Sequence, residues 1–115
     1  MELKRKRLDN GMWLLSVAGE MDLYNVPEFK SAVNDLLEAG APGLISDFGE
    51  LTYIDSSGIG ALLYAFSQGK TRNRGICFAN VTGSVRTVIE LTSLLGFLPI
   101  EESVDAAIAR LEEAT

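Results

Sequence analysis

Two adjacent serines are the residues of this chain best placed to take part in chemistry. Ser56 and Ser57 follow Asp55 and precede Gly58, where an apolar approach over residues 51–54 leads into an amphipathic helical pattern. A serine hydroxyl at such a position can accept a phosphoryl group, or it can simply cap the helix by accepting a hydrogen bond from a backbone amide. Capping alone is the simpler interpretation, but a cap needs one side chain and the sequence offers two.

Two glycines lie within the first turns of the same helix. Gly58 and Gly60 each cost a helix about 1 kcal/mol relative to alanine, so their presence needs a reason. Their missing side chains would leave the backbone open to a partner or to a phosphate. We therefore expect the segment around Ser56 to be a contact surface.

Several kinds of chemistry are excluded by composition. The chain has no histidine, which removes a Ser-His-Asp triad, a His-bearing zinc site and the usual general base near neutral pH. Its one cysteine, Cys77, lies between Ile76 and Phe78 and is expected to be a buried apolar residue. Asp22, Asp47 and Asp55 could meet around a divalent cation, although separate solvated carboxylates are the simpler interpretation. We predict no enzyme activity, no metal site and no cofactor.

The charge balance bears on partners and location. Sixteen acidic against ten basic residues among 115 give a net charge of −6, which argues against direct nucleic-acid binding because phosphates require clustered cations. The basic run over residues 4–7 is expected to be a solvated edge strand. The chain shows neither an apolar stretch of about 18 residues nor the pattern of a signal peptide. We expect a cytoplasmic protein without membrane insertion.

Strands alternate with helices after an opening hairpin, which indicates an α/β fold in a single domain over residues 1–115. Hydrophobic spacing, turn residues and caps locate each element. The expected order is a hairpin turning at Asp9-Asn10-Gly11, a helix from Pro27 to Gly40, a strand over 44–48, a helix carrying Ile59 to Phe66, a strand over 76–79, a helix from Thr82 to Gly96 that includes Leu95, a weak edge strand over 97–100 containing Pro99, and a helix capped by Ser103.

Three blocks of this sequence resemble a STAS domain: Gly19-Glu20-Met21-Asp22, residues 47–61 around Asp55-Ser56-Ser57-Gly58, and residues 81–111. The resemblance spans nearly the whole chain and is greatest to single-domain anti-sigma factor antagonists. It implies a STAS-type mixed, mostly parallel β-sheet with an opening hairpin, covered by about four helices. It also implies that Ser56 is the phosphoacceptor, with Ser57 as the second choice.

The same resemblance implies a function without catalysis by this chain. The unmodified protein would bind an anti-sigma factor that is itself a serine kinase, releasing a sigma factor, and phosphorylation of Ser56 would end that binding until a serine phosphatase reversed it. Two alternatives stay open: a structural STAS subunit of a lipid transporter ATPase, and a module that binds a small ligand or nucleotide at the loops after the strands. The residues expected to contact the partner are Asp22, Asp55, Ser56, Ser57, Gly58 and Ile59.

Overall fold

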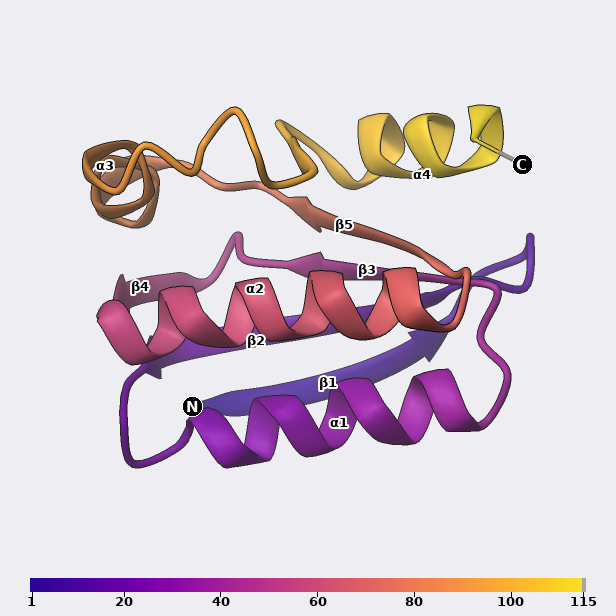
Figure 1. Cartoon of the computed structure of the whole chain (residues 1–115), viewed down its shortest axis with the longest axis horizontal. Coiled ribbons are helices and arrows are strands. Elements are labelled where there is room, and N and C mark those ends of the chain that lie inside the picture. Colours follow the sequence, from indigo (N-terminus) through magenta and orange to yellow (C-terminus); the bar gives the residue numbers. More distant parts are fainter. Residues whose placement is uncertain (115) are drawn as a thin grey trace.

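The computed structural model describes residues 1–114 of the protein. A six-stranded mixed sheet forms its frame (Figure 1). Strands β1–β2–β3–β5–β6 are neighbours in that order, and β4 pairs with the far end of β2. Only β1 and β2 are antiparallel. The elements are β1 (Glu2–Arg7), β2 (Trp13–Met21), α1 (Val26–Glu38), β3 (Gly43–Asp47), β4 (Leu51–Ile54), α2 (Ser56–Thr71), β5 (Gly75–Ala79), α3 (Gly83–Leu91), β6 (Ile100–Glu101) and α4 (Val104–Glu113).

The opening hairpin turns where the sequence predicts it. The Asn10 side chain accepts a hydrogen bond from the backbone amide of Met12 at 3.0 Å. Gly11 has φ +90°, a conformation that side chains rarely adopt. The two strands therefore meet in antiparallel register, with Glu2 opposite Ala18 and Arg7 opposite Trp13.

Side chains alternate between the two faces of the sheet, and each face has its own core. Leu44 and Phe78 belong to the larger core together with the buried residues of α1 and α2, whereas Ile45 and Cys77 belong to a smaller core with residues of α4. The rings of Phe48 and Phe78 stack with centroids 5.8 Å apart. The sheet is thus a middle layer between α1 and α2 on one face and α4 on the other (Figure 1).

Three expectations about the elements are corrected by the structure. Residues 51–54 form strand β4, although only Leu51 and Ile54 of these are buried, so the sequence lacks a clear strand pattern there. Helix α3 ends at Leu91, and Ser93 follows with φ +63°, which leaves Leu95 beyond the helix. The weak strand expected over 97–100 is instead the two-residue strand β6 at the sheet edge, directly after Pro99.

Candidate functional site

Ser56 lies where two parallel strands end at the same edge of the sheet. Met21, the last residue of β2, is paired with Ile54, the last residue of β4. The backbone amide of Asp55 donates to the Met21 carbonyl at 3.3 Å. The loop after β2 and the start of α2 are therefore held side by side, at the left of Figure 1.

Asp55, and not a serine, caps helix α2. Its backbone is extended, its Oδ1 accepts from the Gly58 amide at 3.0 Å, and its carbonyl accepts from the Ile59 amide at 3.0 Å. Neither Ser56 nor Ser57 has a side-chain hydrogen bond to any residue in 1–114. Ser56 is exposed and Ser57 is half-buried. The interpretation that a serine serves only as a cap is therefore wrong, and Ser56 is exposed at the first residue of the helix.

Gly58 allows the start of α2 to pack closely against the sheet. The sequence had instead suggested a backbone left open to a partner. A Cβ built there would lie only 2.4 Å from Cγ1 of Ile54 and 3.3 Å from the Met21 carbonyl oxygen. The helix start approaches the sheet so closely that only glycine fits. Ile59 is also buried, with 5% of its surface exposed. The expectation that Gly58 and Ile59 face a partner is therefore corrected, whereas Gly60 is exposed with nothing within 4 Å of such a Cβ.

The loop after β2 is held by a closed set of hydrogen bonds. Oδ1 of Asp22 accepts from the amides of Tyr24 at 2.9 Å and Asn25 at 3.1 Å. Oδ1 of Asn25 accepts from the Asp22 amide at 2.9 Å, and its Nδ2 donates to the Glu20 carbonyl at 2.8 Å. One carboxylate oxygen of Asp22 therefore fixes this loop.

Sequence reasoning missed two exposed apolar residues on this loop. Leu23 is 65% exposed and Tyr24 is 90% exposed, and both are carried by the rigid hydrogen-bonded turn. Large apolar groups held in water on a fixed backbone are typical of a surface that a partner covers. The available signal was their position directly after Asp22, in a loop that follows a strand. We call Ser56, Leu23 and Tyr24 the Ser56 face.

The three aspartates do not assemble a metal site. Asp47 Oδ1 accepts from the Gly49 amide and from Asn80 Nδ2, both at 2.9 Å. Asp22 and Asp55 cap their own turns. No group of three or more His, Cys, Asp or Glu side chains within residues 1–114 is arranged to hold a metal ion.

Comparison with known proteins places this architecture in a family. The profile of the STAS domain matches residues 4–107. The chain belongs to the STAS domain family. It is 25% identical over 114 residues to BtrV of Bordetella bronchiseptica, described as a candidate anti-sigma factor antagonist, covering 99% of this chain and 97% of that one.

Solved structures of this STAS fold superpose over nearly the whole chain. An anti-sigma factor antagonist from Mycobacterium paratuberculosis has a TM-score of 0.82 at 23% identity and covers 96% of this chain and 93% of its own. The Bacillus cell fate determinant SpoIIAA in its phosphorylated form has a TM-score of 0.71 at 18% identity, covering 95% and 98%. These two likenesses confirm the mixed α/β fold.

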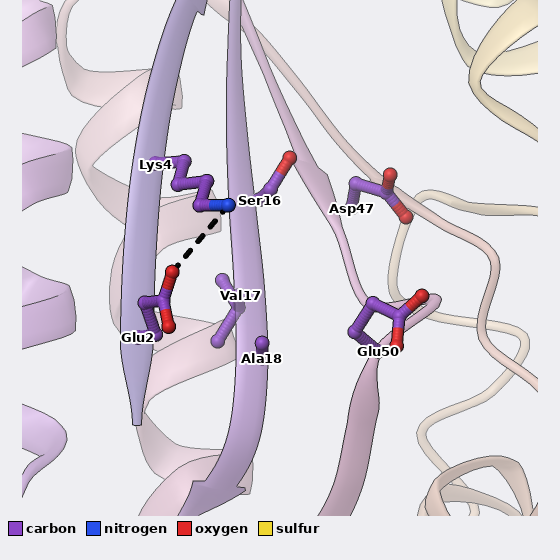
Figure 2. Close-up of a pocket in the computed structure, with 7 residues that line it drawn as sticks. All are labelled: Glu2, Lys4, Ser16, Val17, Ala18, Asp47 and Glu50. Carbon is purple, nitrogen blue, oxygen red and sulfur yellow. Dashed lines mark ion pairs between the residues drawn. The ribbon is translucent and has the colours of Figure 1, made fainter.

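A hollow over strands β1, β2 and β3 is poorly suited to a nucleotide (Figure 2). It has a volume of about 230 Å³ and is lined by Glu2, Lys4, Asp47 and Glu50 beside the small residues of β2. Its one ammonium group is already paired with Glu2 at 3.5 Å. Three carboxylates would repel phosphate, so this hollow does not favour the nucleotide-binding alternative.

Among residues 1–114 no helix has both the length and the apolar character that crossing a bilayer requires.

Proposed function

We propose that this STAS domain is an anti-sigma factor antagonist that binds an anti-sigma factor with serine kinase activity and thereby frees a sigma factor. Phosphorylation of Ser56 by that kinase ends the interaction. The observation that carries the proposal is that Ser56 is exposed, makes no side-chain hydrogen bond within residues 1–114, and is the first residue of a helix already capped by Asp55. Relatives that carry the antagonist description, and a phosphorylated form among the solved structures of the same fold, support it.

The chemistry is supplied by the partner. The Ser56 oxygen attacks the γ-phosphorus of ATP, its proton passes to a base of the kinase, and the bond to the ADP leaving group breaks. A serine phosphatase restores the hydroxyl by transferring the phosphoryl group to water. This chain contributes an accessible nucleophile on a rigid helix start and no catalytic residue of its own.

The added charge accounts for the switch. Phosphoserine carries about −1.5 to −2 charges, here next to Asp55 and the Asp22 loop on a protein of net charge −6. At a helix start the phosphate gains about 0.3–1 kcal/mol from the helix dipole, so the fold should survive modification. Burying the same group in an interface costs several kcal/mol unless the partner neutralises it. A loss of about 2.7 kcal/mol already weakens binding roughly a hundredfold.

Binding of the kinase would cover the Ser56 face. Tyr24 and Leu23 offer large apolar contacts on a preformed loop, which reduces the entropy lost when a complex forms. An aromatic residue at the centre of an interface is a common source of binding energy. Transfer to Ser56 would then place a charged group inside the contact that the unmodified protein makes.

Mass spectrometry after incubation with the kinase tests this proposal. The kinase is captured from native lysate with the unmodified protein as bait, and the mixture is supplied with ATP and magnesium. The intact protein should gain one phosphate, Ser57→Ala should gain it equally, and Ser56→Ala should not. If Ser56→Ala gained a phosphate and Ser57→Ala did not, the phosphoacceptor would be Ser57. No gain by the unaltered protein, together with capture of a membrane ATPase, would favour the transporter alternative.

A further inference from the structure

Two hollows lie at the end of the molecule opposite Ser56, on either side of Pro42. One, of about 280 Å³, is lined by Arg7, Trp13 and the loop before Pro42. The other, of about 480 Å³, is lined by Met12, Lys70 and Arg74 together with Pro42 and Leu111. We call this region the Pro42 end, and it is at the right of Figure 1.

The Pro42 end and the Ser56 face are separated by the length of a strand. Trp13 is the first residue of β2 and is paired with Leu44 near the start of β3. Met21 is the last residue of β2 and is paired with Ile54, two residues before Ser56. A partner at one end therefore leaves the other end free.

The two hollows of the Pro42 end are cationic, against the trend of the chain. Their lining includes Arg7, Lys70 and Arg74, and no Asp or Glu of residues 1–114 lines either hollow. The hollow of Figure 2 holds three carboxylates, and a further hollow beside β6 holds Glu101 and Glu102. Acidic residues outnumber basic ones by sixteen to ten in the chain. The two hollows of the Pro42 end differ from this average because their charged side chains are all basic.

The three cations at the Pro42 end are unpaired in the part of the chain that the structure describes. Within residues 1–114, none of Arg7, Lys70 and Arg74 forms an ion pair. The Lys70 ammonium lies 4.9 Å from the centroid of the Phe66 ring. Nε of Arg74 is buried and has no hydrogen-bond partner among residues 1–114.

Two carboxylates near the ends of the flanking helices are engaged with other groups. Glu38, at the end of α1, pairs with Arg72 at 3.8 Å. Glu112, near the end of α4, accepts from the Asn10 amide at 3.4 Å.

We propose that the Pro42 end binds an acidic, extended segment of a partner protein. Carboxylates of the segment pair with Arg7, Lys70 and Arg74, and its apolar side chains enter the two hollows, whose walls include Trp13, Met12 and Leu111. A nucleic acid fits less well because it has no aliphatic side chains for these walls and would be repelled by the net charge of −6. The proposal does not depend on the function of Ser56.

Fluorescence anisotropy with a defined peptide tests the proposal. The probe is a fluorescein-labelled decapeptide of alternating Glu and Leu, titrated with the full chain at low salt. We expect saturable binding that weakens with added salt. In spectra of the ¹⁵N-labelled protein, the shifted amides should be those of residues 7–13, 39–43 and 70–75, and those of residues 55–60 should stay in place.

Charge-reversal variants make the test specific. Lys70→Glu combined with Arg74→Glu should weaken the peptide at least tenfold, with an unchanged thermal midpoint showing that the fold persists. Lys4→Glu combined with Lys6→Glu makes the same change in net charge on β1, and binding should weaken by less than threefold. An equal loss in both double variants would mean that only net charge matters and would overturn the proposal.

Three other outcomes would also overturn it. The first is no anisotropy change up to the solubility limit of the protein. The second is binding of a labelled twelve-residue oligothymidine as tight as that of the peptide, which would point to nucleic acid. The third is a concentration-dependent dimer in sedimentation that the Lys70→Glu, Arg74→Glu variant abolishes, which would assign the surface to a second copy of the chain.

Discussion

Two glycines separated by one residue of helix α2 are predicted to respond oppositely to alanine. At Gly60 a Cβ meets nothing within 4 Å, so Gly60→Ala should gain the ordinary helix preference of alanine, about 1 kcal/mol. At Gly58 the new Cβ would lie 2.4 Å from Cγ1 of Ile54. Ile54 is 2% exposed, so its side chain has little room to move away.

The expected magnitude at Gly58 is a difference between two effects. Overpacking a well-filled core costs about 1–3 kcal/mol, and the helix preference returns at most about 1 kcal/mol. Gly58→Ala should therefore lose up to about 2 kcal/mol, and the two variants should differ by the overpacking cost, about 1–3 kcal/mol. At roughly 4 °C per kcal/mol for a domain of this size, the melting temperature should rise by about 4 °C in Gly60→Ala and fall by up to about 8 °C in Gly58→Ala.

Urea denaturation and calorimetry of the two variants measure this difference directly. Both substitutions add the same methyl group to the same helix, so each is the control for the other. If Gly58→Ala proved as stable as Gly60→Ala, the close approach to Ile54 would not be the reason for glycine at this position. An open backbone surface for a partner would then be the better explanation of Gly58.

Three further predictions concern the cap, the thiol and the docking loop. Asp55→Ala should lower the unfolding free energy by about 1 kcal/mol in urea because the Gly58 amide loses its acceptor, and Asp55→Asn should restore most of it. Burial raises the pKa of Cys77 to about 11, so iodoacetamide should alkylate the native protein at pH 8 roughly a hundredfold more slowly than it alkylates a free thiol. The alkylation rate should keep rising above pH 9, and a rate that levels off at pH 9 would contradict this. Tyr24→Ala should weaken kinase binding at least about tenfold in calorimetry, with an unchanged melting temperature because the ring is 90% exposed.

Elements defined by local chemistry could be predicted from the sequence. The turn at Asn10-Gly11, the apolar stripe of α1 and the cap of α4 each depend on residues a few positions apart. Ser103 accepts from the Ala106 amide at 3.0 Å, as its position predicts. The family resemblance also predicted the mixed sheet correctly, because its motifs span the whole chain.

Features that depend on distant contacts could not be predicted from the sequence. Asp55, Ser56 and Ser57 can all cap a helix, and only the observed backbone shows that Asp55 does so. The need for glycine at position 58 comes from Ile54 and from the end of β2, more than thirty residues earlier in the chain. Strand β4 was missed because only its first and last residues, Leu51 and Ile54, are buried, which leaves no clear strand pattern in its sequence.

The affinity of the kinase for two forms of this protein tests the central claim most directly. Calorimetry would compare the unmodified protein with protein bearing a single phosphate at Ser56, both shown to be folded by their melting curves. We predict binding at least about a hundredfold weaker for the phosphorylated form, with melting temperatures within about 2 °C of each other. Equal affinities would contradict the switch, and loss of binding with loss of folding would contradict its proposed electrostatic cause.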